Sequence, residues 1–362
     1  MTNIGFIGAG GIARAHAFSL SALRYFYNDS PQINLVSVAS SREASRVSFA
    51  QKYQFAQAQS LNEFGTNGAI DTVFILGPNH THFDHFEMAM GMPNVSHIYL
   101  EKPVCSSESE EENIRKLVQK SVNTPKIQVG FQFLQTPAVR EALVFYQSGV
   151  LGKPIHFDLK YYHGDYLHQA YRDKRKTRLT PAPDGGAMAD LGSHGLSMLI
   201  AFLGADLQVT GAMQSGSFGD VPADSDLFST LSLLERKTQA VGHMSASRVS
   251  SGTGDWVYFE LFAEKGAIRF NSQQADYFEY YLEESGHWVK QPVGSNYAPV
   301  TSFPSGHVPA GWLRSMIHAH YIFLTGNDAL AFNADIDHGL AVQRLVRDTA
   351  THLAYFRSKL RQ

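Results

Sequence analysis

Asp190 and His194 stand four residues apart in the glycine-rich stretch GGAMADLGSHG, residues 185–195. On an α-helix, side chains at positions i and i+4 lie on one face, so the carboxylate and the imidazole could act together. Such a pair fits a metal site, a proton-transfer site, or a polar contact that holds the start of a helix. The stretch alone does not decide among these three, so the rest of the chain has to be considered.

A second candidate site opens the chain, where GFIGAGGIA (5–13) follows the pattern G-x-G-x-x-A. Gly8 permits a tight turn, Gly10 lets the backbone approach a pyrophosphate, and Ala13 allows close packing of helix on strand. The motif follows an apolar run and precedes a helical one, which is the context that dinucleotide binding requires. We therefore expect the phosphates at a helix N-terminus formed by Gly8, Gly10, Gly11, Ile12 and Ala13.

The stretch VASSREASR (38–46) bears on which dinucleotide binds. An NAD site usually places Asp or Glu at the end of the second strand to hold the ribose 2′-hydroxyl, whereas this chain has Ser40, Ser41 and Arg42. Hydroxyls beside a guanidinium suit a 2′-phosphate, so we expect NADP to be preferred over NAD. The alternative is that Ser40 caps the helix and that Arg42 and Arg46 are merely solvated.

The pattern of apolar residues predicts two kinds of architecture. In the first half, short apolar runs at 3–8, 33–39, 71–77, 97–103 and 126–133 alternate with helical stretches at 12–26, 42–53, 81–90 and 108–119. Such alternation is typical of an α/β fold, here an N-terminal Rossmann domain with a doubly wound parallel sheet. SESE (107–110) has the spacing of a capping box at the start of the last of these helices.

The second half is mostly extended after a helix near 137–147. Aromatic-rich runs at 153–163, 226–235, 238–247, 257–270 and 277–284 are joined by turn residues and predict a largely antiparallel sheet. We therefore divide the chain into a nucleotide-binding domain, 1–125, and an α+β substrate and oligomerisation domain, 126–362. A C-terminal helix at 335–356 could pack back on the first domain.

Composition excludes several classes of protein. With 30 Lys+Arg against 33 Asp+Glu in 362 residues, the net charge of −3 gives no electrostatic reason to bind nucleic acid or an anionic membrane. Cys105 is the single cysteine, which rules out intrachain disulfides and cysteine-cluster zinc sites. We find no run long enough for a transmembrane helix and no signal-peptide pattern, so a cytoplasmic protein is the default expectation.

Further motifs follow two predicted strands, GPNHTH (77–82) and EKP (101–103), at strand ends where α/β sheets bind ligands. Together with GFIGAGGIA, GFQFLQTPAV (130–139) and GGAMADLGSH (185–194), they resemble the Gfo/Idh/MocA oxidoreductases, such as glucose–fructose oxidoreductase and inositol dehydrogenase. The resemblance spans most of the chain. It implies a Rossmann domain followed by an open-faced sheet domain that often forms homodimers or homotetramers.

The resemblance also implies which residues form the site. Lys102 of EKP, Asp190 and His194 would line the substrate site beside the nicotinamide, and Pro78, Asn79, His82, Glu101 and Lys102 would contribute to the cofactor site. The chemistry agrees with this transfer, because a histidine can take the hydroxyl proton near neutral pH and a lysine ammonium can stabilise the developing alkoxide. A metal ion, held by His194 with Asp190 or by His82 with His85, is not needed for hydride transfer, and we expect none.

Two departures from the family pattern concern the substrate. Many relatives have an Asp where this chain has Ser197, and an Arg where it has Leu134. Besides Lys102, Asp190 and His194, we expect Gln132, Tyr162, Asp165 and Trp312 to contact the substrate, since such groups bind hydroxyls and stack on sugar rings. The basic stretch HQAYRDKRKTR (168–178) could reach the pocket, although a solvated loop is the simpler interpretation.

The sequence thus predicts an NAD(P)-dependent dehydrogenase that acts on a secondary hydroxyl or carbonyl of a sugar, polyol or sugar derivative. Two alternatives remain open. A glycosidase of the same fold would use bound NAD for a transient oxidation and show no net cofactor turnover. A non-enzymatic sensor would bind the nucleotide and signal to a partner, but it would have no need for Lys102, Asp190 and His194.

Overall fold

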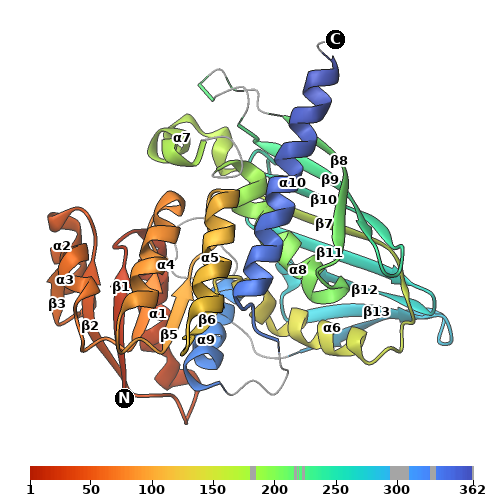
Figure 1. Cartoon of the computed structure of the whole chain (residues 1–362). Helices are drawn as coiled ribbons and strands as arrows, with labels where there is room; N and C mark the ends of the chain where they lie inside the picture. Colours follow the sequence, from red (N-terminus) through yellow and green to blue (C-terminus); the bar gives the residue numbers. More distant parts are fainter. Residues whose placement is uncertain are drawn as a thin grey trace. The chain divides into compact units, whose positions relative to one another are not determined.

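The computed structural model describes residues 1–179, 185–215, 218, 220–221, 225–293, 310–326 and 332–360. The chain divides into two compact units, which we describe separately (Figure 1). The first unit contains Met1–Gln132 and Met316–Leu340, and the second contains Phe133–Ser315 and Ala341–Gln362. The predicted division at residue 125 is therefore wrong in two respects: residues 126–132 belong to the first unit, and a late segment of the chain returns to it.

The first unit contains a parallel sheet with the order β3-β2-β1-β4-β5-β6 among the described residues. This confirms the predicted doubly wound sheet, in which neighbouring strands run the same way and helices supply the crossovers. The short strand β3 was not predicted. The strands are β1 (Thr2–Ile7), β2 (Ile33–Ala39), β3 (Gln57–Gln59), β4 (Thr72–Ile75), β5 (His97–Leu100) and β6 (Lys126–Val129).

The helices of this unit are α1 (Gly11–Phe26), α2 (Glu43–Tyr53), α3 (Leu61–Gly65), α4 (His82–Gly91), α5 (Glu108–Lys120) and most of α9 (Ala310–Thr325). The predicted capping box is present at the start of α5, where Ser107 accepts from the backbone N–H of Glu110 and the Glu110 side chain accepts in return. Helix α9 was not predicted, because its apolar residues do not follow a clear single stripe.

Helix α9 supplies part of the apolar core of the first unit although it is some 300 residues away from β1 in sequence. Its residues Ile317, Ile322 and Phe323 are buried with Phe6 of β1 and Phe74 of β4. At its C-terminal end, the Lys126 ammonium donates to the carbonyl oxygens of Ile322 and Phe323, each at 2.8 Å. A lysine at this end also complements the negative end of the helix dipole.

The second unit contains a mostly antiparallel sheet, again as predicted, with the order β14-β13-β12-β11-β7-β10-β9-β8 among the described residues. The exception is the parallel pair β7 and β10. The strands are β7 (Pro154–Tyr162), β8 (Leu207–Ser215), β9 (Phe228–Glu235), β10 (Val241–Ser247), β11 (Trp256–Ala263), β12 (Gly266–Asn271), β13 (Tyr277–Leu282) and β14 (His287–Pro292). The helices are α6 (Pro137–Gln147), α7 (Gln169–Lys174), α8 (Ser193–Leu203) and most of α10 (Ile336–Leu360).

One face of this sheet packs against helices α6 and α8. The Phe202 ring of α8 lies 4.8 Å from that of Phe259, and a Cβ on Gly195 would come within 2.7 Å of Leu159 and Met244 side chains. Side chains alternate between the faces of a strand, so the neighbouring residues of each strand form the opposite face. Part of that face is exposed, with Val241 54% and Trp288 39% accessible.

No helix in the described residues is long and apolar enough to cross a membrane.

We expect the protein to lose stability between pH 6.5 and pH 4. Burial lowers the pKa of His85 and of His338 to about 4. The unfolded chain binds protons at these histidines below pH 6.5 and the folded protein does not, so acidification favours unfolding, by up to about 3 kcal/mol for each histidine. Thermal unfolding of the wild type and of His85→Gln across this pH range measures the effect. An unchanged melting temperature between pH 7 and 4.5 would contradict it, and the variant should lose less stability on acidification than the wild type.

Candidate active site

The candidate nucleotide site lies where the parallel strands of the first unit end. Residues Ile7 and Ala39 are paired in register, as are Ile7 and Ile75, and Leu100 and Val129. The strands run in one direction, so the residues that follow them leave the sheet at one edge. The structure thereby brings together five predicted site segments, which begin at Gly8, Ser40, Pro78, Glu101 and Gln132.

The glycine loop between β1 and α1 fits a dinucleotide. Gly8 has φ +126°, and a Cβ there would lie 2.6 Å from the Leu76 carbonyl group, so only glycine fits. At Gly10 and Gly11, by contrast, an added Cβ would meet no described atom within 4 Å. Ala13 is fully buried, as close packing of helix on strand requires.

The N-terminus of α1 is open to an anion. Gly10 is the N-cap residue and offers no side-chain acceptor, and the first turn contains no acidic residue. The first N–H groups of this 16-residue helix therefore lack the protein acceptors that a capping side chain would supply, and they carry the positive end of the helix dipole. Residues present at this position fit a pyrophosphate.

At the end of β2, the loop residues form a small hydrogen-bonded turn. The Ser40 hydroxyl donates to the Arg42 carbonyl oxygen at 3.0 Å, and Arg46 Nη1 donates to the Ser40 carbonyl oxygen at 3.2 Å. The N-cap of α2 is Arg42 rather than Ser40, so the alternative that Ser40 caps this helix is wrong. Ser41 and Arg42 are exposed, and Arg46 is folded back beside Ser40.

The loop after β4 contains Pro78, which is exposed, and Asn79, which begins a short 3₁₀ turn, Asn79–Thr81. His82 follows and is buried, with Nδ1 2.6 Å from the Pro103 carbonyl oxygen and Nε2 3.1 Å from that of Gly77. Burial lowers its pKa, and a neutral ring donates to only one of these two carbonyl oxygens at a time. His82 therefore links two loops of the edge, and its ring nitrogens face backbone carbonyl groups rather than a cofactor.

Glu101 and Lys102 leave the end of β5. Glu101 is buried, and its Oε1 lies 2.9 Å from His16 Nε2 while its Oε2 accepts the backbone N–H of Lys102 at 3.2 Å. Both carboxylate oxygens of Glu101 are bonded within the unit, and its predicted contact with a cofactor stays a prediction. Lys102 is half-buried at the same edge. The sequence analysis missed His16, whose only signal was a histidine among alanines just after the glycine loop.

In the second unit, Asp190 lies in a π-helical turn, Met188–Gly192, which leads directly into α8. Such turns are rare and recur at functional sites. The α-helical spacing assumed for Asp190 and His194 is thus not the observed one. Asp190 Oδ1 accepts from Arg178 Nη1 at 2.7 Å, and Oδ2 accepts from Arg248 Nη2 at 2.8 Å.

Arg248 is fully buried and its guanidinium lies 4.5 Å from the centre of the Tyr166 ring. Its Nη1 also donates to the Arg178 carbonyl oxygen at 2.5 Å. A buried guanidinium needs a carboxylate partner, so Arg248 holds the Asp190 carboxylate in place. Asp190 in turn raises the pKa of Arg178. Neither arginine contact was predicted.

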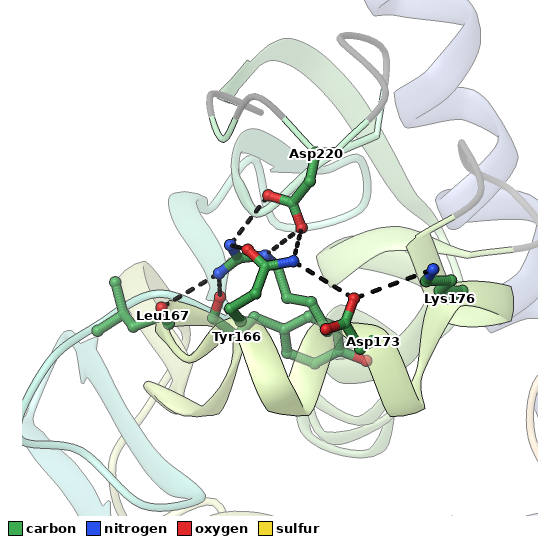
Figure 2. A network of polar contacts seen from close by, with 7 residues as sticks. Tyr166, Leu167, Asp173, Lys176 and Asp220 are labelled. Atoms are coloured by element: carbon green, nitrogen blue, oxygen red, sulfur yellow. Dashed lines mark hydrogen bonds and ion pairs between the residues drawn. The ribbon is translucent and has the colours of Figure 1, made fainter.

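Most residues of the basic stretch 168–178 are exposed, as the interpretation as a solvated loop predicts. The stretch differs from a free loop because Gln169–Lys174 is helical and contacts with Asp220 anchor it (Figure 2). Arg172 is 5% exposed, and its Nε and Nη2 donate to Asp220 at 2.8 and 2.9 Å. Its Nη1 donates to the carbonyl oxygens of Tyr166 and Leu167 at 2.8 and 3.1 Å. This anchor fixes α7 and the segment after it, which ends at the arginine that binds Asp190.

His194, in the first turn of α8, is 5% exposed. Its ring packs edge-on against Phe133, with 5.3 Å between centroids, and lies 6.0 Å from Tyr161. Tyr161 donates to Asp255 at 2.9 Å, and burial raises its pKa well above 10, so it remains a neutral hydroxyl.

Tyr162 does not join this group, which corrects its predicted role in substrate binding. Successive residues of β7 point to opposite faces of the sheet, so Tyr161 lies beside His194 and Tyr162 lies on the open face. There its hydroxyl lies 2.7 Å from the Ser245 hydroxyl oxygen and its ring packs 5.7 Å from Trp256. The sequence analysis also missed Tyr161.

The other predicted substrate residues are scattered over the two units. Gln132 is buried at the end of the first segment of the first unit, while Trp312 is half-buried in the first turn of α9. Asp165 lines a separate cavity of about 440 Å³ with Gly164, His168 and the 251–254 turn. The two departures from the family pattern, Ser197 and Leu134, are both buried. No group of three or more His, Cys, Asp or Glu side chains among the described residues could hold a metal ion.

Comparison with known proteins agrees with this architecture. Residues 2–131 match the family described as "Oxidoreductase family, NAD-binding Rossmann fold", and residues 139–269 match the GFO/IDH/MocA C-terminal domain. Levoglucosan dehydrogenase of Pseudarthrobacter phenanthrenivorans is 26% identical over 303 residues, which are 76% of this chain and 74% of that protein. Glucose-6-phosphate 3-dehydrogenase of Bacillus subtilis is 24% identical over 55% of this chain and 53% of its own.

A solved structure of levoglucosan dehydrogenase in complex with NADH and levoglucosan superposes with a TM-score of 0.80, at 20% identity and with 97% of each chain covered. The two domain matches together cover well over half of the chain, in the order that the fold shows. The chain therefore belongs to the GFO/IDH/MocA oxidoreductases.

Proposed function

We propose that the protein is an NAD(P)-dependent dehydrogenase that transfers a hydride between nicotinamide and a secondary hydroxyl or carbonyl of a sugar, polyol or sugar derivative. The observation that carries the proposal is the sheet edge of the first unit, where the glycine loop follows β1 and Lys102 follows β5, on either side of β4. Both curated relatives compared above are named as sugar dehydrogenases, which supports the substrate class.

Lys102 and His194 carry the proton chemistry in this proposal. Oxidation of a secondary alcohol removes a proton from oxygen and a hydride from carbon, and the nicotinamide accepts the hydride when bound. The Lys102 ammonium stabilises the developing alkoxide, and His194 acts as the general acid or base. Asp190, held between Arg178 and Arg248, binds substrate hydroxyls through its remaining lone pairs.

Replacing either catalytic group should slow turnover. We expect Lys102→Met and His194→Ala to lower kcat on the order of 10²–10⁴-fold, the usual loss for a group that transfers a proton or stabilises its charge. Nucleotide affinity should change far less, since backbone N–H groups of the glycine loop hold the pyrophosphate. Steady-state kinetics at the nicotinamide absorbance band, with a panel of sugars and polyols, together with nucleotide titration, measures both quantities.

Exposed residues of the same types provide the controls: Lys120→Met and His287→Ala should keep wild-type kcat. Wild-type kcat in Lys102→Met would refute the assignment. Substrate conversion without net change of the cofactor would instead indicate the glycosidase alternative, and nucleotide binding without any conversion would indicate the sensor.

We further propose that NADP is the preferred cofactor. Ser41 and Arg42 are exposed at the end of β2, so one guanidinium group is available near the expected 2′-phosphate position. A second, that of Arg46, lies beside Ser40, where it bonds the Ser40 carbonyl oxygen and pairs with Glu43 at 4.0 Å. An acidic side chain, which would repel a 2′-phosphate, is not among residues 38–42. Charge-assisted bonds from arginine are the usual means of binding such a group.

NADP should therefore bind roughly tenfold more tightly than NAD, a difference of about 1.4 kcal/mol. Arg42→Ala should remove most of that preference and leave the affinity for NAD unchanged. Lys52→Ala, at the other end of the same helix, is the matched control. Equal affinities of the wild type for the two nucleotides in a calorimetric titration would refute the preference.

The open face of the second sheet is proposed to bind a second copy of this chain. Apolar and aromatic side chains lie side by side on it: Phe262 stacks on His156 at 4.5 Å, and Val241 is paired with His156 in the next strand. The neighbouring row alternates in charge, with Lys290, Glu279 and Arg269 in register across β14, β13 and β12. A row that contains both signs can pair with its own copy about a twofold axis.

Light scattering at micromolar concentration should therefore show a dimer or larger assembly. Val241→Arg places a charge on the open face and should shift the protein towards the monomer. Tyr25→Arg, at an exposed position of the first unit, should leave the assembly unchanged. A monomeric wild type would exclude this interface.

A further inference from the structure

A chain of three buried polar side chains in the first unit ends at the backbone of Lys102. His320 Nε2 of α9 lies 2.8 Å from His16 Nδ1 of α1, and His16 Nε2 lies 2.9 Å from Glu101 Oε1. Glu101 Oε2 then accepts the N–H of Lys102. Both histidines are fully buried and Glu101 is 6% exposed, so solvent does not compete for these bonds.

The nitrogen that carries the proton in each of these two histidines can be assigned by starting from His320. Burial lowers the pKa of His320 well below its usual value, so this ring is neutral. Its Nδ1 has no hydrogen-bond partner among the described residues, which makes it the unprotonated nitrogen, because a buried N–H without an acceptor is costly. His320 then donates from Nε2 to His16 Nδ1, and His16 donates from Nε2 to the Glu101 carboxylate.

Each link of the chain is held by packing. The His16 and His320 rings are nearly parallel, with 25° between their planes and 5.0 Å between centroids, and the Phe74 ring lies edge-on to His320 at 5.3 Å. A Cβ on Gly130, at the end of β6, would come within 2.6 Å of Glu101 Oε1. The Glu101 carboxylate thus occupies a slot that only glycine at residue 130 leaves open.

The segment around Lys102 is restrained from its other side too. The Pro103 carbonyl oxygen is bound by His82 Nδ1 at 2.6 Å, and Val104 packs against Gly339, where a Cβ would come within 2.5 Å of it. Bonds on both sides of Lys102 therefore define the direction in which its side chain leaves the sheet edge. Of these restraints, the bond to Glu101 is the one that connects the segment to helix α1, because Glu101 is also bonded to His16.

We propose that His16 is a positioning residue for Lys102. By bonding Glu101, it ties the lysine loop to α1, the helix whose N-terminus is expected to hold the pyrophosphate. The buried hydrogen bonds from His320 to His16 and from His16 to Glu101 thus hold the lysine ammonium in position relative to the nucleotide. This inference rests on the proposed function, in which Lys102 stabilises the alkoxide, because misplacement of about 1 Å can cost 10²-fold in rate.

A matched pair of substitutions tests the bond to Glu101. The amide nitrogen of glutamine reaches about as far from the backbone as Nε2 of histidine, whereas that of asparagine reaches only as far as Nδ1. His16→Asn should therefore lower kcat by 10- to 100-fold, with the nucleotide Kd within twofold of wild type. His16→Gln should recover most of the lost kcat. His338→Asn, which replaces another buried histidine of the same unit, is the control and should keep wild-type kcat.

Hydrogen exchange in the nucleotide-free protein tests the same link without turnover. The Lys102 amide is bonded to Glu101, so exchange in the segment 100–106 should speed up in His16→Asn, but not in His16→Gln or His338→Asn. If His16→Asn does not fold, Gly130→Ala displaces Glu101 without altering either histidine and should also speed up exchange there.

The outcomes separate the two proposals. Wild-type protein that converts no sugar or polyol would refute the proposed function, while the exchange experiment would still report on the link between His16 and Lys102. Unchanged exchange in folded His16→Asn, equal loss of kcat in His16→Gln and His16→Asn, or an equal loss in His338→Asn would each overturn the positioning role.

Discussion

Parallel pairing of β1 with β2 on one side and β4 on the other is the constraint on which the first unit depends. Because all strands of this sheet run in one direction, the chain must leave every strand at the same edge and return by a crossover. Five segments with no sequence proximity thereby emerge side by side, and the order reverses between β1 and β4, where such sheets bind ligands. The close approach of Gly8 to the Leu76 backbone marks this crossing point.

The sheet brings these loops to one edge, and buried polar groups then fix their conformations. A buried charge or amide without a partner is costly, so a loop that contributes one is held to whatever satisfies it. In the first unit, His82 joins the loops that contain Gly77 and Pro103. In the second unit, Arg172 anchors the basic stretch 168–178 through Asp220, and Arg248 holds Asp190. In both units, buried polar contacts thus restrain segments that contain candidate site residues.

Parts of the first unit differ in how well the sequence predicted them. Rossmann architecture leaves a local pattern of strand, glycine loop and helix, which is why the fold class, the family and the first site segment were predicted. Helix α9 leaves no such pattern, because it belongs to the first unit through contacts with residues some 300 positions earlier. The domain boundary was misplaced for the same reason.

The sequence by itself determined the glycine loop, the serine and arginine residues after β2, and the spacing that placed Lys102, Asp190 and His194 in a recognised family. Each of these depends on neighbouring residues, which a linear pattern records. Only the tertiary structure decided that Tyr161 rather than Tyr162 lies beside His194, because one residue of strand register selects the face of the sheet. It also decided the partners of Asp190, which lie 12 and 58 residues away, and the bond from His16 to Glu101 across 85 residues. Contacts over such distances depend on how the whole core packs, and no local run of residues encodes them.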